Sequence, residues 1–335
     1  MNVALIRLSS LGDVVHGLPV AAALRARWPE ARLTWVVERR HGVVLHGHPA
    51  LDDVLFVDGQ RWRRARRPRQ ITDAMRQIMA VPRRLRDRRF DVAIDLQGLL
   101  KSGLLTVATR APIRIGFAAG RCREPLSAIF TNRRVTPPAG AMHVVDQNLA
   151  LLTALDGLEH AAARFDLPSE PGAEERADDF FAACGLKPRD GVVVLNPGAG
   201  RPAKRWPPAR FSELARRITH AGVGKVVVVW GPGERELARS IVTGCAESDA
   251  VVAPPTDVPG LTAILRRASV MISGDSGPLH LAAALGLPCV GLFGPTSALR
   301  NGPYGTVHKT IQSSAGALDA ITGAEVFELV EELLA

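Results

Sequence analysis

The chain of 335 residues is longer than one hydrophobic core usually organises, so we expect two domains. With 47% hydrophobic and 22% charged residues it has the composition of a globular protein, which excludes a largely disordered chain. Its four cysteines lie far apart and form no CxxC pair, which argues against a zinc site and a disulfide framework and favours a reducing compartment.

The net charge of +9 belongs to the first half of the chain. Residues 1–168 contain 26 Lys and Arg against 15 Asp and Glu, whereas residues 169–335 contain 16 against 18. A domain with that excess attracts an anionic partner, such as nucleic acid, a membrane surface or a phosphorylated substrate. The N-terminus lacks the features of a signal peptide and no apolar run reaches about 18 residues, so we expect a cytoplasmic protein that does not span a membrane.

Short apolar runs alternate with helical patterns along the first half of the chain. Residues 14–28 are typical of a helix, and a later helical stretch follows residue 96. The runs typical of buried strands are NVALIRL at 2–8, LTWVV at 33–37 and DVAIDL at 91–96. This alternation predicts βαβ units and a parallel sheet.

The first predicted strand runs into the sequence SSLGDVVHGLP, in which Gly12 allows a tight turn and Asp13 lies at the start of the next helix. A carboxylate at a strand end can act as a general base that takes the proton of a substrate hydroxyl. Aspartate is also a favoured N-cap residue, and the spacing alone favours the cap over the base.

Between residues 61 and 69 the sequence RWRRARRPR contains six arginines and no acid. Guanidinium groups bind phosphate and carboxylate in a bidentate way, and Trp62 offers a ring that can cover a sugar. A charge run is usually a solvated face, but six uncompensated arginines repel one another and favour an anionic ligand. Nucleic acid is the competing ligand, although the chain has one tyrosine and no helix-turn-helix or RNA-binding signature.

Residues 166–190 are polar, with proline and glycine, and we place the linker between the domains there. The second half then repeats the strand–helix alternation, and the amphipathic end of the chain predicts a closing helix. Its apolar runs, each ending in a Gly or Pro turn, lie at 191–198, 225–233, 270–275 and 288–295. Because ligands of open parallel sheets bind beyond the carboxyl ends of the strands, these turns predict a ligand site.

One of these strands ends in Gly274-Asp275-Ser276-Gly277, where a helix containing His280 begins. The free N–H groups and the dipole of a helix N-terminus suit a diphosphate. The pattern fits an ordinary cap equally well, in which Asp275 or Ser276 satisfies the first amides and His280 is a surface residue.

A second turn, NPGAGRPAKRWPP at 196–208, places Lys204 and Arg205 after a loop rich in glycine and proline. Cations at this position can offset charge on a leaving diphosphate without a metal ion. No GxxxxGK[ST] spacing is present, which argues against a P-loop. A solvated Lys-Arg pair is the competing interpretation, which the pattern alone slightly favours.

Six segments follow one another along the chain as SSLGDVVHGLP, RWRR at 61–64, DLQGLLKSG at 95–103, REPLS at 123–127, PAKRWP at 202–207 and GDSGPLHLAAALGLPCVGLFGPT at 274–296. Together they resemble the ADP-heptose:lipopolysaccharide heptosyltransferases of glycosyltransferase family 9. The resemblance implies the GT-B fold, an α/β architecture of two Rossmann-like domains that face each other across a cleft. It also implies a reaction that inverts the anomeric centre and needs no metal or cofactor.

With this resemblance we expect an acceptor-binding domain over 1–168, a linker over 169–190, a nucleotide-sugar-binding domain over 191–320 and a closing helix over 321–335. By position, the resemblance assigns the catalytic base to Asp13 and a cation near the donor phosphates to Lys204. The donor-binding residues that it implies are Gly198, Glu234, Asp275, Ser276, Gly277 and His280, with Glu234 expected to reach the ribose or the base. The acceptor-binding residues that it implies are Ser10, Gly12, Arg61, Arg63, Arg64, Gln97, Lys101, Arg123 and His143.

The acceptor-side segments resemble heptosyltransferase I, whereas NPGAGRPAKRWPP is closer to heptosyltransferase II. Because acceptor motifs decide the choice of acceptor, we favour type I, which adds the first heptose to Kdo. The expected partners are ADP-heptose, a Kdo-lipid A type acceptor and, by peripheral contact, the anionic cytoplasmic face of the inner membrane; we expect a monomer that does not bind nucleic acid. Two alternatives stay open, a related transferase acting on another anionic glycan and a nucleic-acid-binding or regulatory protein on the same fold.

Overall fold

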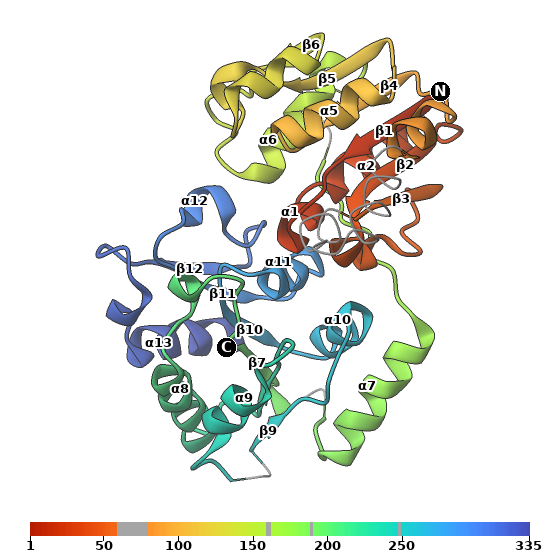
Figure 1. Ribbon diagram of the computed structural model, residues 1–335. Coiled ribbons are helices and arrows are strands. Elements are labelled where there is room, and N and C mark those ends of the chain that lie inside the picture. Colours follow the sequence, from red (N-terminus) through yellow and green to blue (C-terminus); the bar gives the residue numbers. More distant parts are fainter. Residues whose placement is uncertain (59–79, 159–161, 188–189, 247–248) are drawn as a thin grey trace, which may run out of the picture. The chain divides into compact units, whose positions relative to one another are not determined.

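The computed structural model describes residues 1–58, 80–158, 162–187, 190–246 and 249–335 (Figure 1). The chain divides into two compact units, Met1–Pro168 and Ser169–Ala335. Each unit contains one six-stranded sheet in which every neighbouring pair of strands is parallel. The predicted α/β fold with two Rossmann-like domains is confirmed.

The sheet of the first unit has the order β3-β2-β1-β4-β5-β6. Its strands are β1 (Asn2–Ile6), β2 (Arg32–Glu38), β3 (Asp53–Val57), β4 (Val92–Asp95), β5 (Ile113–Phe117) and β6 (Arg133–Val135). The central strands are buried on both faces, which is why their sequences are continuous apolar runs. The strand order reverses between β1 and β4, so the turns that follow these two strands leave the sheet side by side.

Helices that the structure describes in the first unit include α1 (Leu11–Val15), α2 (Leu18–Arg27), α5 (Leu100–Ala108) and α6 (Val144–Ala150), and residues 80–86 are also helical. Short 3-10 turns include η1 (Arg39–His41) and η4 (Pro125–Phe130). The single helix predicted over 14–28 was wrong, because the chain forms α1 and α2 with a break at His16 and Gly17. A Cβ atom on Gly17 would lie 2.8 Å from the Trp35 ring, and Pro19 near the start of α2 lacks an N–H for a continuous helix.

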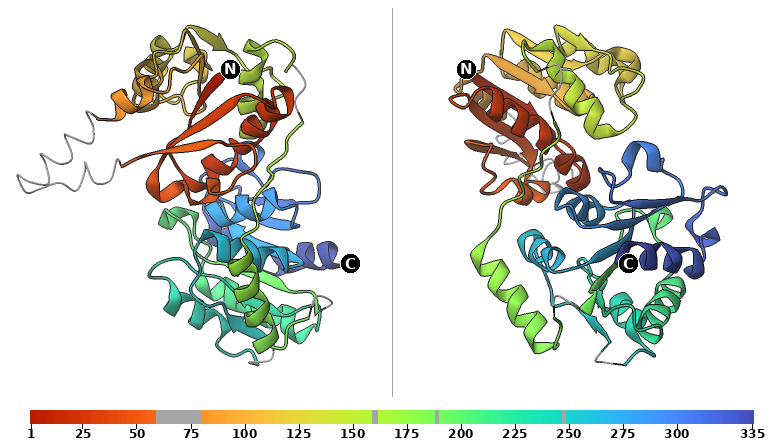
Figure 2. Two further views of the ribbon diagram at one scale, coloured as in Figure 1. Left: turned by 90° about the vertical axis from the view of Figure 1, so that its right-hand side faces the viewer. Right: turned by 180° about the vertical axis from the view of Figure 1, so that it is seen from behind.

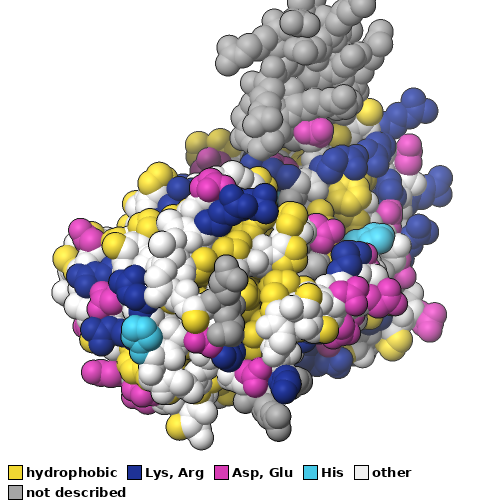
Figure 3. Space-filling model, turned by 90° about the horizontal axis from the view of Figure 1, so that it is seen from below, with side chains coloured by type: hydrophobic (Ala, Val, Ile, Leu, Met, Phe, Trp, Pro, Cys, Tyr) yellow, Lys and Arg dark blue, Asp and Glu magenta, His cyan; other side chains and the backbone are white. Residues whose placement is uncertain are grey.

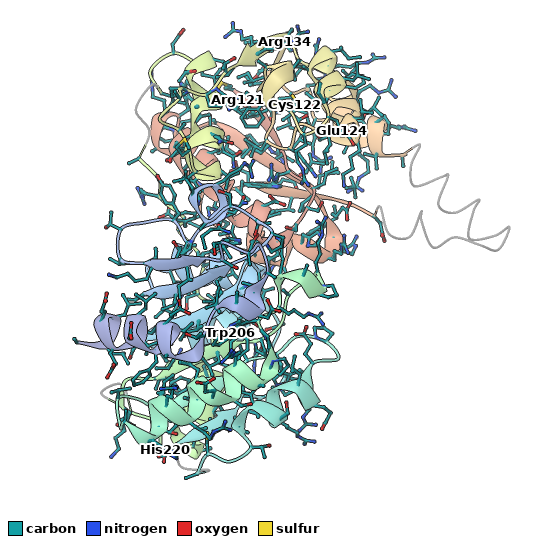
Figure 4. The ribbon with its side chains drawn as sticks, turned by 90° about the vertical axis from the view of Figure 1, so that its left-hand side faces the viewer. Arg121, Cys122, Glu124, Arg134, Trp206 and His220 are labelled. Carbon is teal, nitrogen blue, oxygen red and sulfur yellow. The ribbon has the colours of Figure 1, made fainter. Side chains whose placement is uncertain are left out.

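The sheet of the second unit has the order β12-β11-β10-β7-β8-β9, with its own reversal between β10 and β7. Its strands are β7 (Val193–Asn196), β8 (Val226–Val228), β9 (Ala250–Val252), β10 (Val270–Gly274), β11 (Cys289–Phe293) and β12 (Lys309–Gln312). Trp206, labelled in Figure 4, fills its core, where the indole donates to the Ile321 carbonyl at 3.0 Å and meets the Phe211 ring edge to face. Because β7 and β10 are neighbouring parallel strands, the turns that follow them emerge next to each other.

Helices surround this second sheet. They are α7 (Pro171–Ala183), α8 (Pro208–His220), α9 (Arg235–Val242), α10 (Val258–Arg266), α11 (Gly277–Ala284), α12 (Ala298–Asn301) and α13 (Gly323–Leu334), with the 3-10 turn η7 (Pro202–Lys204). The amphipathic α13 packs against α8 at the end of the chain. None of the helices within the described residues is long and apolar enough to cross a bilayer.

The range 169–190, expected as a linker, is largely occupied by α7, which packs against α10 (Figure 2). Arg267 fixes this contact, because its guanidinium pairs with Glu174 at 2.5 Å and with Asp178 at 2.7 Å. The polar residues that suggested a linker are those of an exposed helix face with ion pairs, so this segment belongs to the second unit.

Candidate functional site

Asp13 lies in the turn between β1 and α1. The N-cap of α1 is Ser10 and not Asp13, and Asp13 is the third residue of the helix. Its carboxylate accepts hydrogen bonds from the Ser10 amide at 2.8 Å and the Ser10 hydroxyl at 3.0 Å, as in a capping box. One carboxylate oxygen thus serves the helix start, while the side chain keeps 27% of its surface exposed to solvent.

The other oxygen of Asp13 pairs with Arg7, whose side chain is almost completely buried. Arg7 also donates to the Leu96 carbonyl at the end of β4. Burial raises the pKa of Asp13, but the Arg7 charge and the Ser10 hydrogen bonds outweigh it and hold the pKa below its ordinary value. Asp13 is therefore ionised at neutral pH and able to accept a proton. The sequence analysis missed Arg7, although its partner Asp13 follows six residues later, and its contact with Leu96 depends on the pairing of β1 with β4.

The turn after β4 is organised by Asp95, a buried carboxylate that the sequence analysis also missed. Its oxygens accept from the amides of Gln97 at 2.8 Å and Gly98 at 3.1 Å and from the hydroxyl of Ser102 at 2.9 Å. Burial raises the pKa of Asp95, while these hydrogen bonds act in the opposite direction. The Gln97 side chain accepts from the Leu8 amide at 2.8 Å, so it ties the β4 turn to the loop that leads to Asp13.

Lys101 extends from the first turn of α5 to the end of β2. Its ammonium group pairs at 3.2 Å with Glu38, a buried carboxylate that also lies 3.4 Å from Arg40. Nearby His41 is neutral at pH 7, because burial and the Arg40 charge lower its pKa to about 4. Asp13, Glu38 and Lys101 all act on His41 electrostatically, which places these charged groups around one part of the first unit.

The remaining residues predicted on the acceptor side differ in burial and in their contacts. His143 caps α6 by accepting from the Val145 amide at 3.1 Å, and its ring meets that of His16, just after α1, edge to face at 5.5 Å. Gly12 is buried within α1, and Ser10 is exposed. Arg123 is exposed and lies two residues before η4 begins. Arg61, Arg63 and Arg64 lie outside the described residues.

In the second unit Asp275 lies where β10 ends and joins two other predicted residues. Lys204 donates to one carboxylate oxygen at 2.6 Å, and the His280 ring lies 3.2 Å from the other. Burial raises the pKa of Asp275, but the hydrogen bonds and charges of His280 and Lys204, together with Thr296, place it well below its ordinary value. His280 is buried and is not the surface residue of the competing interpretation.

A polar network fixes the start of α11. The Asn196 amide nitrogen lies 2.9 Å from the Ser273 hydroxyl and 3.1 Å from the Ser276 hydroxyl, and the two hydroxyls are 2.9 Å apart. The Ser276 hydroxyl is thus engaged inside the protein. No side-chain cap hydrogen bond is formed by Ser276, the N-cap of α11, so the amides that begin with Gly277 are arranged as a helix N-terminus that favours an anion.

Gly198 and Glu234 come together from the loops after β7 and β8. A Cβ atom on Gly198 would lie 2.1 Å from a Glu234 carboxylate oxygen, so only glycine leaves room for this carboxylate. Glu234 accepts from the Gly231 amide at 3.0 Å and pairs with Arg205 at 3.4 Å. Gly274 has a similar role, because its Cβ atom would lie 2.3 Å from the Lys204 carbonyl oxygen.

Each unit thus gathers predicted residues at the carboxyl ends of its central strands. The first unit offers an ionised, partly exposed carboxylate, and the second offers a lysine beside a helix N-terminus. A carboxylate of this kind suits deprotonation of a hydroxyl, and a cation beside a helix N-terminus suits a phosphate leaving group. Within the described residues, no group of three His, Cys, Asp or Glu side chains is arranged to hold a metal ion.

Comparisons with known proteins agree with this geometry. The model of glycosyltransferase family 9 (heptosyltransferase) matches residues 78–325. The chain is 33% identical to lipopolysaccharide heptosyltransferase 1 of Pseudomonas aeruginosa over 91% of this chain and 82% of that protein. It is 28% identical to the protein of the same name from Escherichia coli over 99% of this chain and 100% of that protein.

Solved structures give the same result. The structure of E. coli heptosyltransferase WaaC with ADP superimposes with a TM-score of 0.82 and 26% identity over 99% of this chain and 100% of that chain. The E. coli ADP-heptose lps heptosyltransferase II has the same fold, with a TM-score of 0.76 and 22% identity over 100% of this chain and 98% of that chain. The predicted GT-B fold class and the predicted glycosyltransferase activity are confirmed, and the chain belongs to glycosyltransferase family 9, the heptosyltransferases.

Proposed function

We propose that this enzyme transfers heptose from ADP-heptose to the Kdo region of the lipopolysaccharide inner core, as a type I heptosyltransferase. Two ion pairs carry the proposal, Asp13 with Arg7 in one unit and Lys204 with Asp275 in the other. The relatives named lipopolysaccharide heptosyltransferase 1 support the choice of acceptor. The similar structure of E. coli heptosyltransferase WaaC, which was solved with ADP, supports the choice of donor.

In the proposed reaction an acceptor hydroxyl oxygen attacks the anomeric carbon of heptose as its bond to the ADP oxygen breaks. The hydroxyl proton passes to the Asp13 carboxylate, and the electron pair of the broken bond leaves with ADP. Direct displacement of this kind inverts the anomeric centre. The charge that develops on ADP is stabilised by the Lys204 ammonium group and by the N-terminus of α11, which supply the role that a metal ion has in other transferases.

The other predicted residues take supporting roles in the proposal. Glu234, which lies next to Gly198 and Arg205, would bind the ribose or the base of the donor. The anionic groups of the acceptor would be bound by Lys101, Arg123 and the arginines at 61, 63 and 64. We further propose that the enzyme works as a monomer without a cofactor, in peripheral contact with the cytoplasmic face of the inner membrane.

The proposal is tested by incubating the protein with ADP-heptose and deacylated Kdo-lipid A, with and without EDTA. NMR of the product gives the configuration of the new glycosidic bond relative to the donor. We expect an inverted anomeric centre and the same rate with the chelator. A product with retained configuration, or a rate abolished by EDTA and restored by a divalent ion, would refute the corresponding part of the mechanism.

A further inference from the structure

Five large apolar side chains are exposed on two adjacent elements of the first unit. On α5 they are Leu100, Leu104 and Val107, with 39%, 58% and 43% of their surface exposed. On η4 they are Leu126 and Ile129, with 67% and 66% exposed. We call these five residues the α5–η4 apolar surface. Exposed apolar side chains that cluster in this way mark an interaction site, whereas scattered ones need no explanation.

The three residues on α5 share one face of the helix, because they follow the spacing i, i+4 and i+7. The opposite face, with Ser102, Gly103 and Thr106, is buried.

Close packing makes the two elements one surface. A Cβ atom on Gly103 would lie 2.3 Å from the Phe130 ring, so glycine lets the end of η4 approach α5 directly. The Leu100 amide donates to the Glu124 carboxylate at 2.6 Å, just before η4 begins. The apolar side chains of α5 and η4 are therefore neighbours.

The segment that carries this surface is strongly basic. Residues 98–135 contain seven Lys and Arg and one acid, Glu124, whose carboxylate is engaged by the Leu100 amide. Six of the basic side chains are exposed, and Figure 4 labels two of them, Arg121 and Arg134, near Glu124. The exposed set is Lys101, Arg110, Arg121, Arg123, Arg133 and Arg134.

We propose that the α5–η4 apolar surface docks the protein on an anionic lipid bilayer. The five apolar side chains enter the boundary between headgroups and acyl chains, and the surrounding guanidinium groups bind lipid phosphates. A second copy of the chain is a poor occupant, because an isologous contact would bring two such basic segments together. The inference rests on the proposed function, since a lipid-linked acceptor requires the enzyme to work at a bilayer.

The test compares the parent protein with the triple variant Leu104→Gln, Leu126→Gln and Ile129→Gln. Sedimentation with vesicles of phosphatidylglycerol and phosphatidylethanolamine measures membrane binding, and vesicles of phosphatidylcholine measure binding to a neutral surface. The matched control is Leu299→Gln, because Leu299 is 62% exposed on α12 in the other unit. Turnover of a deacylated, water-soluble acceptor shows whether each variant is folded and active.

We expect the parent to prefer the anionic vesicles and the triple variant to bind them about tenfold to 100-fold more weakly, as loss of three partly inserted side chains implies. Turnover of the soluble acceptor stays at the parent rate in both variants. Docking that depends on these residues in a protein without turnover would uphold this inference and refute the proposed function. The inference is overturned if the triple variant binds like the parent, if Leu299→Gln weakens binding equally, or if sedimentation in the absence of lipid shows a dimer that the triple variant dissociates.

Discussion

At the residue scale, Asp13 combines a capping interaction with a partly buried ion pair. The Ser10 amide and hydroxyl bind one carboxylate oxygen, and Arg7 binds the other. The cap and the base are therefore compatible in one side chain. An asparagine at this position keeps an oxygen for Ser10 but removes the charge that balances Arg7, so a substitution affects stability as well as chemistry.

We predict that Asp13→Asn lowers kcat by about 10²–10⁴, because the amide cannot accept a proton at neutral pH. It also lowers the free energy of unfolding by about 1–3 kcal/mol, since Arg7 loses its negatively charged partner. Steady-state kinetics and urea denaturation measure the two effects.

Asp53→Asn is the matched control, because Asp53 has the same 27% side-chain exposure and pairs with Arg88 at 2.6 Å on β3, away from the predicted site. It should lose stability without losing kcat. An Asp13→Asn protein that is folded and turns over at the parent rate would exclude Asp13 as the base.

The lowered pKa of Asp13 predicts the pH dependence of the enzyme. A carboxylate whose folded pKa lies below its unfolded value of about 3.9 stays ionised from pH 8 to pH 5. It contributes stability above that unfolded value and loses the contribution as pH falls through the folded pKa. We expect kcat to show no decline between pH 8 and pH 5 from this group. A pH–rate profile whose acid limb has a midpoint between pH 6 and 7, and which is missing in Asp13→Asn, would contradict the account.

Lys204 is the second residue whose role has a direct test. Lys204→Met removes the ammonium group 2.6 Å from Asp275. We predict a fall in kcat of about 10²–10³, the cost of losing one group that stabilises transition-state charge. Lys225→Met is the control, since Lys225 forms an ion pair with Asp249 in the same unit. Equal effects of the two substitutions on kcat would show that Lys204 is only structural.

At the element scale, the end of β10 positions the loop that carries Lys204. Gly274→Ala would place a Cβ atom 2.3 Å from the Lys204 carbonyl oxygen, so the backbone of η7 must move. We predict a loss of about 1–3 kcal/mol in the free energy of unfolding, as for other overpacked positions, together with a lower kcat. The control is Gly200→Ala in the same loop, where no atom lies within 4 Å of the added Cβ. A silent Gly274→Ala would show that the loop adjusts freely.

The strands could be predicted from the sequence because strands buried on both faces are continuous apolar runs, as in β1 and β10. The break between α1 and α2 could not, because it depends on the contact of Gly17 with Trp35. The residues at strand ends, such as Asp13 and Asp275, carried a local signal. Glu38 carried none, because its partner Lys101 is distant in sequence and the folded sheet brings the two together. Arg7 and Asp95 have partners within seven residues, but nothing in their local pattern marks them as polar anchors inside apolar strand ends.

At the scale of the whole molecule, the excess of positive charge belongs to residues 1–168, and the exposed arginines around α5 and η4 account for part of it. Figure 3 shows another face, on which acidic and basic side chains are interspersed. The uneven distribution fits the proposed function, in which the first unit would meet an anionic acceptor and a lipid surface and the second unit would bind a small nucleotide sugar.

The most direct measurement is ADP release from ADP-heptose with two deacylated acceptors, one that ends in Kdo and one that already carries the first heptose. The account predicts turnover with the Kdo acceptor, little with the heptosylated one, and a loss of about 10²–10⁴ for Asp13→Asn. Turnover with the heptosylated acceptor alone would contradict the type I assignment, and a protein that uses neither acceptor would contradict the proposed function.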